Sequence, residues 1–176
     1  MDWYQKLSSY FPAHEMKDRA HLDNLLKHKD EYKKIETDNY LVLYAEFPDF
    51  IFIDYLLVFQ STRGKGIGSR VLSKFKKQRK SIILEVEPRD PDDPDTAKRL
   101  RFYEKNGFKY ADQVQYTFKD LEGNSFPMKL FYWPPHELSQ REIMKRMQRT
   151  ITEIHNFGRK QVITDPERVL RFREFS

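Results

Sequence analysis

Residues 50–87 contain the pattern that most restricts how this chain can fold. An almost wholly apolar run, FIFIDYLLVF (50–59), is followed by the glycine-rich stretch STRGKGIGSR (61–70). Apolar residues then recur with helical spacing, and a second apolar run, SIILEVE (81–87), closes the segment. A strand that is apolar on both faces is normally covered on both sides, and two strands joined through a helix pair in parallel. The segment therefore predicts a βαβ unit within an α/β fold.

The patterns around this unit predict further strands and helices. We expect helices over 2–10, 13–28, 96–107 and 138–157, and strands over 39–47, 114–118 and 127–133. The stretch EYKKIETD (31–38) is ambiguous between a helix end and an edge strand, and the last dozen residues are not assigned. We expect one domain over residues 1–176, with a core at about 39–134, a C-terminal helical extension at 138–157 and a tail at 158–176.

The composition narrows the class of protein. With 176 residues, 39% of them apolar, the chain can bury the core of one domain. It has no cysteine, which excludes disulfides and thiolate chemistry, and its five histidines show no metal spacing, so no metal is expected. The start of the chain does not read as a signal peptide and the longest apolar run is too short to span a bilayer, so we expect a soluble cytoplasmic protein without a membrane partner. The net charge of +5 is interspersed with acidic residues and favours anionic ligands, but not a nucleic-acid partner.

The glycines at the strand-to-helix junction indicate an anion site. Exposed amides and the positive end of a helix dipole bind phosphate at such a junction without any cation. A P-loop is excluded, because Gly68 is followed by Ser69 and Arg70 rather than by Lys and Ser or Thr. A dinucleotide-binding fingerprint would need its third glycine one residue later. Glu85 and Glu87 lie near the distance of a ribose-binding acid, but the repeated βα units of that fold are missing.

Three motifs in order carry a resemblance to a known family. The loop RGKGIG (63–68), the preceding strand IDYLLV (53–58) and the downstream helix end RFYEKNGF (101–108) resemble the Gcn5-related N-acetyltransferases (GNAT family). The resemblance spans roughly residues 39–134, and within the family the chain is similar to a bacterial subgroup. It implies an α/β fold with a mixed, mostly antiparallel sheet split between two parallel central strands, flanked by helices. The C-terminal helical extension would be added to this fold.

The resemblance also implies an activity. Such a protein is an acyltransferase that passes an acetyl group from acetyl-CoA to a primary amine, by direct attack of the amine on the thioester. The acceptor would be a small molecule, a peptide N-terminus or a protein lysine. The alternative is a non-catalytic acyl-CoA-binding or regulatory module of the same fold. A nucleic-acid-binding protein is a weaker third reading.

The family motif assigns the coenzyme A site to particular positions. The pyrophosphate would lie on the backbone of Arg63, Gly64, Lys65, Gly66, Ile67 and Gly68, extended by the Ser69 hydroxyl. Leu56, Leu57 and Val58 would offer backbone groups to the pantetheine arm, with one amide near Leu57 or Val58 facing the thioester carbonyl. The resemblance also assigns Thr96 to the cofactor, at a position where many members carry an Asn that contacts it.

The catalytic assignments carry open alternatives. Tyr103 matches the Tyr that protonates the departing thiolate in many members, or it packs the helix against the sheet. Asp54 is the first choice for the general base, since it interrupts an apolar strand, but it could equally pair with a buried Arg. Glu46 is the second choice, and Glu85 and Glu87 lie on the neighbouring strand.

Two departures from the family pattern affect these expectations. The family usually opens with a strand, whereas this chain begins directly with WYQKLSSYF (3–11). The 138–157 helix extends past the usual core. It would pack on the sheet or on a second subunit of a homodimer, or would wall the acceptor pocket together with Phe131, Tyr132 and Trp133.

Overall fold

The computed structural model describes residues 1–120, 122–159 and 165–173. The chain forms two compact units, Met1–Lys80 and Ser81–Ser176, and each is described by itself. The predicted class is confirmed: the fold is mixed α/β, with mostly antiparallel strands flanked by helices. The strands of the predicted βαβ unit fall in different units. A single domain over the whole chain stays a prediction.

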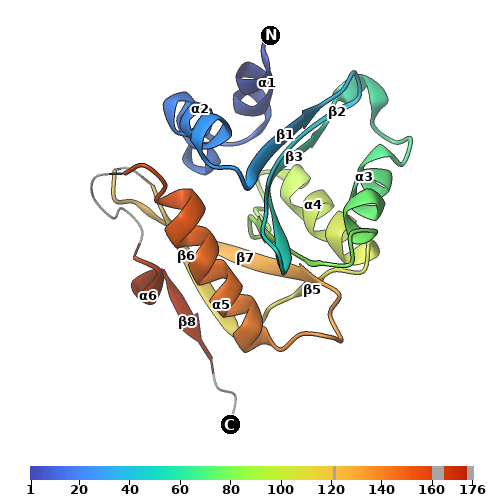
Figure 1. Ribbon diagram of the computed structural model, residues 1–176. Helices are drawn as coiled ribbons and strands as arrows, with labels where there is room; N and C mark the ends of the chain where they lie inside the picture. Colours follow the sequence, from blue (N-terminus) through green and yellow to red (C-terminus); the bar gives the residue numbers. More distant parts are fainter. Residues whose placement is uncertain (121, 160–164, 174–176) are drawn as a thin grey trace. The chain divides into compact units, whose positions relative to one another are not determined.

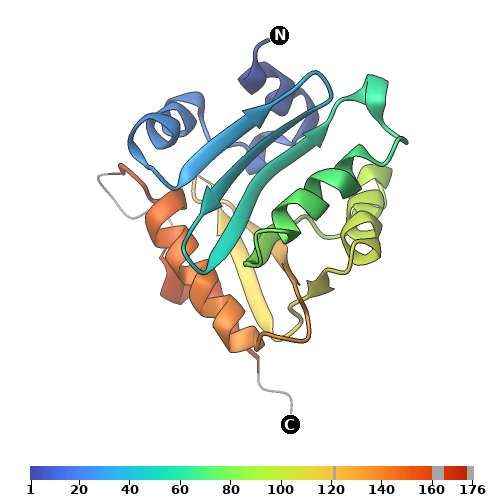
Figure 2. The same cartoon turned by 45° about the vertical axis from the view of Figure 1, so that its right-hand side comes forward.

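The first unit is a three-stranded antiparallel meander with helices on both faces. Its helices are α1 (Trp3–Tyr10), α2 (Arg19–His28) and α3 (Ile67–Lys76), its 3-10 turns η1 (Ala13–Glu15) and η2 (Gln60–Thr62), and its strands β1 (Tyr32–Glu36), β2 (Tyr40–Glu46) and β3 (Phe50–Val58). α1 and α2 lie on one side of the strands and α3 on the other (Figure 1). Figure 2 shows α3 in front of β3, which it follows in the chain.

Capping side chains fix where the first two helices begin. Asp2 caps α1 in a reciprocal capping box with Gln5, and Asp18 caps α2 by accepting from the amide of His21. The predicted helix over 13–28 is therefore wrong at its start. Only η1 forms there, because the chain is extended at Met16 and Asp18, and a new helix starts after Asp18.

The core of the first unit comes from alternating and helical apolar positions. Leu7 of α1 and Leu22 and Leu25 of α2 are fully buried, and most residues of β2 and β3 are buried. On the other face, Val71, Leu72 and Phe75 of α3 are buried, which confirms the helical spacing read after the glycine loop. Both strand faces are covered, and this explains why β3 reads as an apolar run.

The second unit is an antiparallel sheet with β7 at its centre. Its strands are β4 (Ser81–Val86), β5 (Lys109–Tyr110), β6 (Val114–Lys119), β7 (Ser125–Trp133) and β8 (Leu170–Phe172), and its helices α4 (Pro94–Lys105), α5 (Gln140–Thr150) and α6 (Pro166–Val169). β7 pairs with β4, β5 and β6, and β6 also pairs with β8. The predicted hairpin of β6 and β7 is confirmed.

Two helices of the second unit matter for the site. α4 begins beyond its cap Asp93 and ends before Gly107, whose φ of 85° is the left-handed conformation predicted for a helix stop. α5 continues into one turn of π-helix, η3 (Ile151–His155), where the amide of Asn156 bonds the carbonyl of Ile151 across 2.9 Å. The predicted helix over 138–157 thus forms, with a change of winding in its last turn.

Some elements were not predicted. The ambiguous stretch 31–38 contains β1, and the unassigned C-terminal residues contain α6 and β8 in their described part. β5 is two residues long and carries no periodic signal. In the described ranges, no helix has both the length and the apolar character needed to cross a lipid bilayer.

Candidate functional site

The glycine loop adopts a backbone that only glycine accepts easily. Gly64 has φ 82° and Gly66, the N-cap of α3, has φ 73° and ψ 16°. A Cβ atom at either position would meet nothing within 4 Å, so the requirement is conformational and the space above both glycines is open. Among the residues that the structure describes, no side chain caps α3. The amides of its first turn have no intrahelical acceptor, and the loop therefore offers an anion site at a helix N-terminus.

Two arginines hold the loop in place. The Nε atom of Arg63 donates to the carbonyl of Val58 across 3.0 Å, and its guanidinium lies 4.9 Å from the ring centroid of Tyr10. Arg70 donates to the carbonyl of Lys65 across 2.9 Å. Both arginine side chains are thus used to fasten the loop to β3 and α3. Lys65, whose side chain is exposed, is the cation of the loop that is best placed to meet a ligand.

The other predicted cofactor residues in the first unit lie at the end of β3 and in the first turn of α3, and their cofactor contacts stay a prediction. Ile67, Gly68 and Ser69 form the first turn of α3, with Gly68 buried. At the end of β3, Leu57 is buried while Leu56 and Val58 are half-buried. The structure therefore brings the strand end and the loop together, joined by η2.

Asp54 is a bulged residue with both carboxylate oxygens engaged. The β2–β3 register passes from Leu43↔Tyr55 to Tyr44↔Ile53, so that the ladder with β2 skips Asp54. Its Oδ1 lies 2.8 Å from Nζ of Lys17, and its Oδ2 accepts the hydroxyl of Tyr32 across 2.6 Å. The alternative of a buried ion pair thus describes its contacts, with a Lys in place of the Arg that the sequence suggested. Its role as general base stays a prediction.

Glu46 lies at the end of β2 in an ion-paired setting. One of its oxygens is 3.0 Å from Nζ of Lys33 and the other 3.8 Å from Nζ of Lys80. The hydrogen bond from Lys33 raises the pKa of that lysine. Both carboxylate oxygens of Glu46 thus face a lysine ammonium.

Tyr103 and Thr96 belong to the second unit. Tyr103 is half-buried near the end of α4, with its ring 5.7 Å from that of Phe108 in an edge contact. Thr96 is fully buried in the first turn of α4, where its hydroxyl accepts from the amide of Asp90 and donates to the carbonyl of Asp93. Its hydroxyl therefore fixes the loop before α4. The predicted cofactor contact of Thr96 stays untested.

The sequence did not reveal a cluster around Glu85. Its Oε1 accepts the hydroxyl of Tyr116 across 3.0 Å and lies 2.7 Å from Nε2 of His155. Glu85 is on β4, Tyr116 on β6 and His155 in the π-helical turn η3. Within the described part of the chain, Oε2 of Glu85 has no hydrogen-bond partner, and the side chain is 15% exposed. Oε1 of Glu85 is thus held by two contacts, while Oε2 is left without a hydrogen bond from the described residues.

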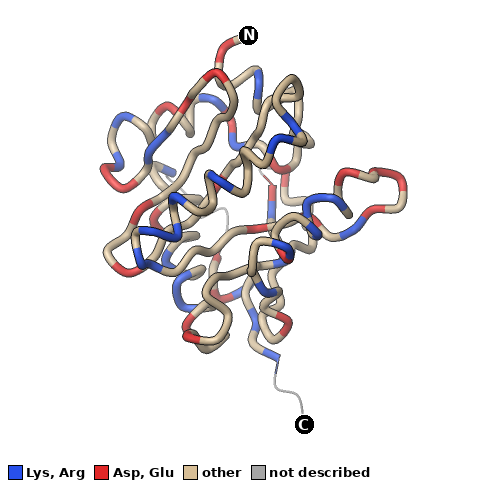
Figure 3. The backbone as a smooth tube through the Cα atoms, turned by 90° about the vertical axis from the view of Figure 1, so that its right-hand side faces the viewer, with Lys and Arg blue, Asp and Glu red and all other residues tan. Residues whose placement is uncertain are grey.

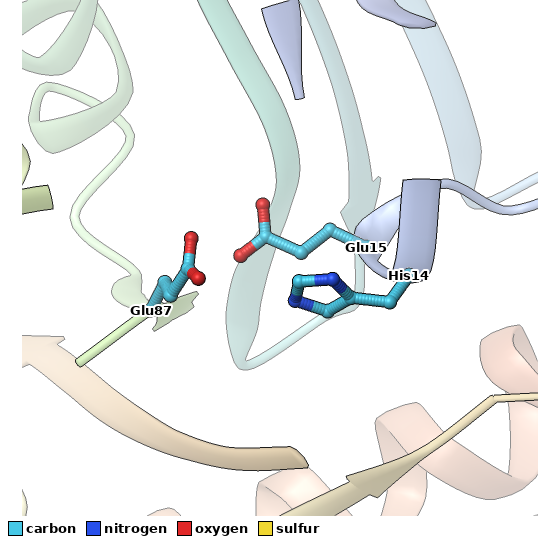
Figure 4. A group of neighbouring side chains, drawn as sticks. All are labelled: His14, Glu15 and Glu87. Atoms are coloured by element: carbon cyan, nitrogen blue, oxygen red, sulfur yellow. The ribbon is translucent and has the colours of Figure 1, made fainter. Parts of the chain in front are cut away.

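Charged and aromatic groups elsewhere were also singled out by the sequence. Lysines and arginines alternate with acidic residues along the chain, as Figure 3 shows. Figure 4 draws His14 and Glu15 of η1 with Glu87, which follows β4. His14 and Glu15 belong to the first unit and Glu87 to the second, and the expected absence of a metal stays a prediction. Phe131 and Tyr132 are buried at 1% exposure, so packing accounts for both.

Comparison with known proteins places the chain among acetyltransferases. The model of the family described as "Acetyltransferase (GNAT) domain" matches residues 29–110. A protein of Bacillus subtilis (strain 168) named "Putative acetyltransferase YjbC" is 46% identical over 159 residues, which cover 89% of this chain and 83% of that protein.

Solved structures share the fold. "Putative acetyltransferase from GNAT family from Bacteroides thetaiotaomicron" superposes with a TM-score of 0.70 at 20% identity, covering 88% of each chain. Arabidopsis thaliana NAA60, solved in complex with a bisubstrate analogue, gives a TM-score of 0.54 at 13% identity, over 74% of this chain and 88% of its own.

Proposed function

Because the chain belongs to the GNAT acetyltransferase family, we propose that it transfers an acetyl group from acetyl-CoA to a primary amine. The observation that carries this proposal is the glycine loop. Gly64 and Gly66 hold left-handed conformations under open space, at the N-terminus of an uncapped helix. This is the backbone that a pyrophosphate needs.

The cofactor would bind along the end of β3 and the loop. The amides of residues 64–69 receive the pyrophosphate, with the Ser69 hydroxyl adjacent in the same turn, and Lys65 meets the adenosine 3′-phosphate. The backbone of residues 56–58 pairs with the pantetheine arm in the manner of an added strand. An amide at Leu57 or Val58 then stabilises the oxyanion that forms on the thioester carbonyl.

The reaction moves one acyl group and one proton. The neutral amine attacks the thioester carbonyl, the new C–N bond forms and the C–S bond breaks. Tyr103 donates a proton to the thiolate as it leaves. The amine nitrogen gives up a proton to a carboxylate, and exchange with solvent then returns a proton from the carboxylate to Tyr103, so that one proton in net terms passes from the amine to the thiol of coenzyme A and the product is an amide.

Glu85 is the carboxylate whose contacts best suit this proton transfer. Both oxygens of Asp54 are engaged, and Glu46 is paired with two lysines. Glu85 instead has Oε1 held by two donors while Oε2 is open. A carboxylate oriented in this way can accept a proton on Oε2 while both contacts to Oε1 remain in place.

Calorimetric titration with acetyl-CoA tests the proposal. We expect binding by the wild-type protein and none by Gly66→Glu, which puts a charged side chain into the open space above the loop. Gly123→Glu is the matched control, because Gly123 has φ 83° and equally open surroundings but lies in the β6–β7 turn. Equal binding losses in both variants would show that strain, not the loop, is responsible.

Transfer itself is then measured against a panel of amines. A peptide with an N-terminal alanine, a peptide with an internal lysine, and spermidine represent three acceptor classes. Release of coenzyme A that depends on one of these amines supports the enzyme. Binding of acetyl-CoA without transfer to any amine would favour a non-catalytic acyl-CoA-binding module.

A further inference from the structure

β3 contains one residue more than its pairing with β2 can accommodate. Seven residues of β2 pair with seven of the nine residues of β3, and Asp54 is the residue that the ladder skips. A bulge bends the strand and increases its local twist, so the residues beyond it point in a new direction. Those residues, 56–58, are the ones that the proposed function assigns to the pantetheine arm.

The bulged residue is fixed by a buried charge pair. The side chain of Asp54 is 5% exposed and that of Lys17 10% exposed, and their charged atoms are 2.8 Å apart. Tyr32 donates to the second carboxylate oxygen, and burial together with the nearby carboxylate of Asp54 raises the pKa of this phenol well above its ordinary value. Tyr32 therefore stays a neutral donor, and every strong acceptor site of Asp54 faces a partner.

The backbone groups of Lys17 are also held in place, by hydrogen bonds to two tyrosine hydroxyls. The hydroxyl of Tyr55, the residue after the bulge, accepts from the amide of Lys17 across 2.8 Å and donates to the carbonyl of Glu15 across 2.8 Å. The hydroxyl of Tyr4 donates to the carbonyl of Lys17 across 3.0 Å. Two consecutive residues of β3 thus bind one extended segment between η1 and α2, by its ammonium group and by its backbone.

We infer that Lys17, Asp54 and Tyr32 are positioning residues that lock the β3 bulge. A buried charge without its partner is far more costly than the pair, so the strand has one arrangement in which both charges are satisfied. This arrangement sets the twist with which residues 56–58 reach the glycine loop. The lock follows from the contacts alone, and only its consequence for acetyl-CoA rests on the proposed function.

The lock and the function are tested by separate measurements. Hydrogen exchange of the amides of residues 55–58 reports the bulge without any ligand, and calorimetry reports the affinity for acetyl-CoA. In Lys17→Met, which keeps the aliphatic stem, we expect these amides to exchange at least about tenfold faster, while those of the β6–β7 hairpin do not change. We expect the Kd of acetyl-CoA to rise by about tenfold.

The double variant separates a lock from a simple loss of contacts. Asp54→Asn leaves Lys17 buried without its partner, and we expect it to resemble Lys17→Met. Lys17→Met combined with Asp54→Asn removes both charges and should recover part of the protection and of the affinity. Lys98→Met is the control, since Lys98 pairs with Asp95 within α4 of the second unit, and it should behave as wild type. Should the charge variants fail to fold, Tyr32→Phe keeps both charges and should give a smaller rise in exchange.

Three outcomes would overturn the inference. Unchanged exchange at residues 55–58 in Lys17→Met would show that the pair does not hold the bulge. A uniform rise across both units would show a general loss of stability instead. Loss of turnover in Asp54→Asn, with exchange and affinity as in wild type, would make Asp54 the base. If wild-type protein fails to bind acetyl-CoA, the proposed function fails, while the exchange measurement still decides whether the lock exists.

Discussion

Nε2 of His155 lies 2.7 Å from Oε1 of Glu85, although the two residues are 70 positions apart in the sequence. An ionised carboxylate only accepts hydrogen bonds, so the hydrogen must be on Nε2 of the imidazole. The hydroxyl of Tyr116 adds a second donor to the same oxygen. Both donors thus hold the same oxygen of Glu85, and its other oxygen takes part in neither contact.

Glu85→Gln tests whether this oxygen accepts the proton of the amine. We expect kcat to fall about 10²- to 10⁴-fold, the usual contribution of a general base, with the Kd of acetyl-CoA unchanged. The assay is amine-dependent release of coenzyme A. Glu122→Gln, an exposed carboxylate in the β6–β7 turn, should keep full activity. If the Glu85→Gln enzyme keeps the wild-type kcat, Glu85 is not the general base, and Asp54 and Glu46 are again the candidates for that role.

We expect His155 to matter because it donates a hydrogen bond to Glu85, and not because its imidazole ring fills space. His155→Gln can place its amide nitrogen near the position of Nε2, whereas His155→Phe leaves Glu85 without this bond. We expect the Phe variant to lower the free energy of unfolding by about 1–3 kcal/mol, and the Gln variant by less. Urea denaturation at pH 7 measures the difference. Equal losses in the two variants would mean that ring packing, and not the hydrogen bond, is what matters.

Tyr103→Phe separates an acid from a packing residue. The edge contact with Phe108 survives the change, so we expect the free energy of unfolding to stay within about 0.5 kcal/mol of wild type. If Tyr103 is the proton donor to the thiolate, removal of its hydroxyl should lower kcat by at least about 10²-fold. Calorimetry should give an unchanged Kd for acetyl-CoA. Wild-type turnover in this variant would confine Tyr103 to packing.

Lys65→Ala should reveal the contact with the 3′-phosphate. We expect the affinity for acetyl-CoA to fall by about 0.5–1 kcal/mol, the usual value of an exposed ion pair, and the loss to shrink at high salt. Acetyl-3′-dephospho-CoA, which lacks that phosphate, should bind wild type and variant equally. Lys27→Ala, on the exposed side of α2, should have no effect. A loss of equal size with both ligands would place Lys65 at the pyrophosphate instead.

The raised pKa of Tyr32 predicts that the folded protein loses stability at alkaline pH. Its pKa is raised well above the ordinary value of about 10, first by burial and then by the charge of Asp54. Above pH 10 the unfolded chain releases this proton while the folded chain keeps it, so stability is complete below pH 10 and falls as the pH rises further. Wild type should lose up to about 1.4 kcal/mol per pH unit more than Tyr32→Phe. Urea unfolding at pH 8, 9, 10 and 11 measures this, and parallel curves would contradict it.

Local signals in the sequence were enough for most of the fold. Glycine positions, helix periodicity and the apolar runs predicted β3, α3 and β4, and the stop at Gly107 predicted the end of α4. The helix over 13–28 was wrong because its break depends on the cap Asp18 and on the tyrosines that hold the backbone of Lys17. Those tyrosines, Tyr4 and Tyr55, are distant in sequence.

The candidate site divides in the same way. The glycine loop has a local pattern and could be predicted residue by residue. The partner of Asp54 and the cluster around Glu85 could not, because each joins side chains from separate elements. The π-helical turn that carries His155 differs from an α-helix by one residue of winding, and no periodicity in the sequence records it.

The bulge in β3 has a consequence for how this protein can diverge. The surplus residue of the strand is also the residue that carries the buried charge. Deletion of the single codon for Asp54 would restore a regular ladder between β2 and β3. The same deletion would leave the buried ammonium group of Lys17 without its carboxylate partner. The bulge and the buried charge are therefore gained or lost together in evolution. We expect relatives that lack an acidic residue at the position of Asp54 to lack the lysine at the position of Lys17 as well.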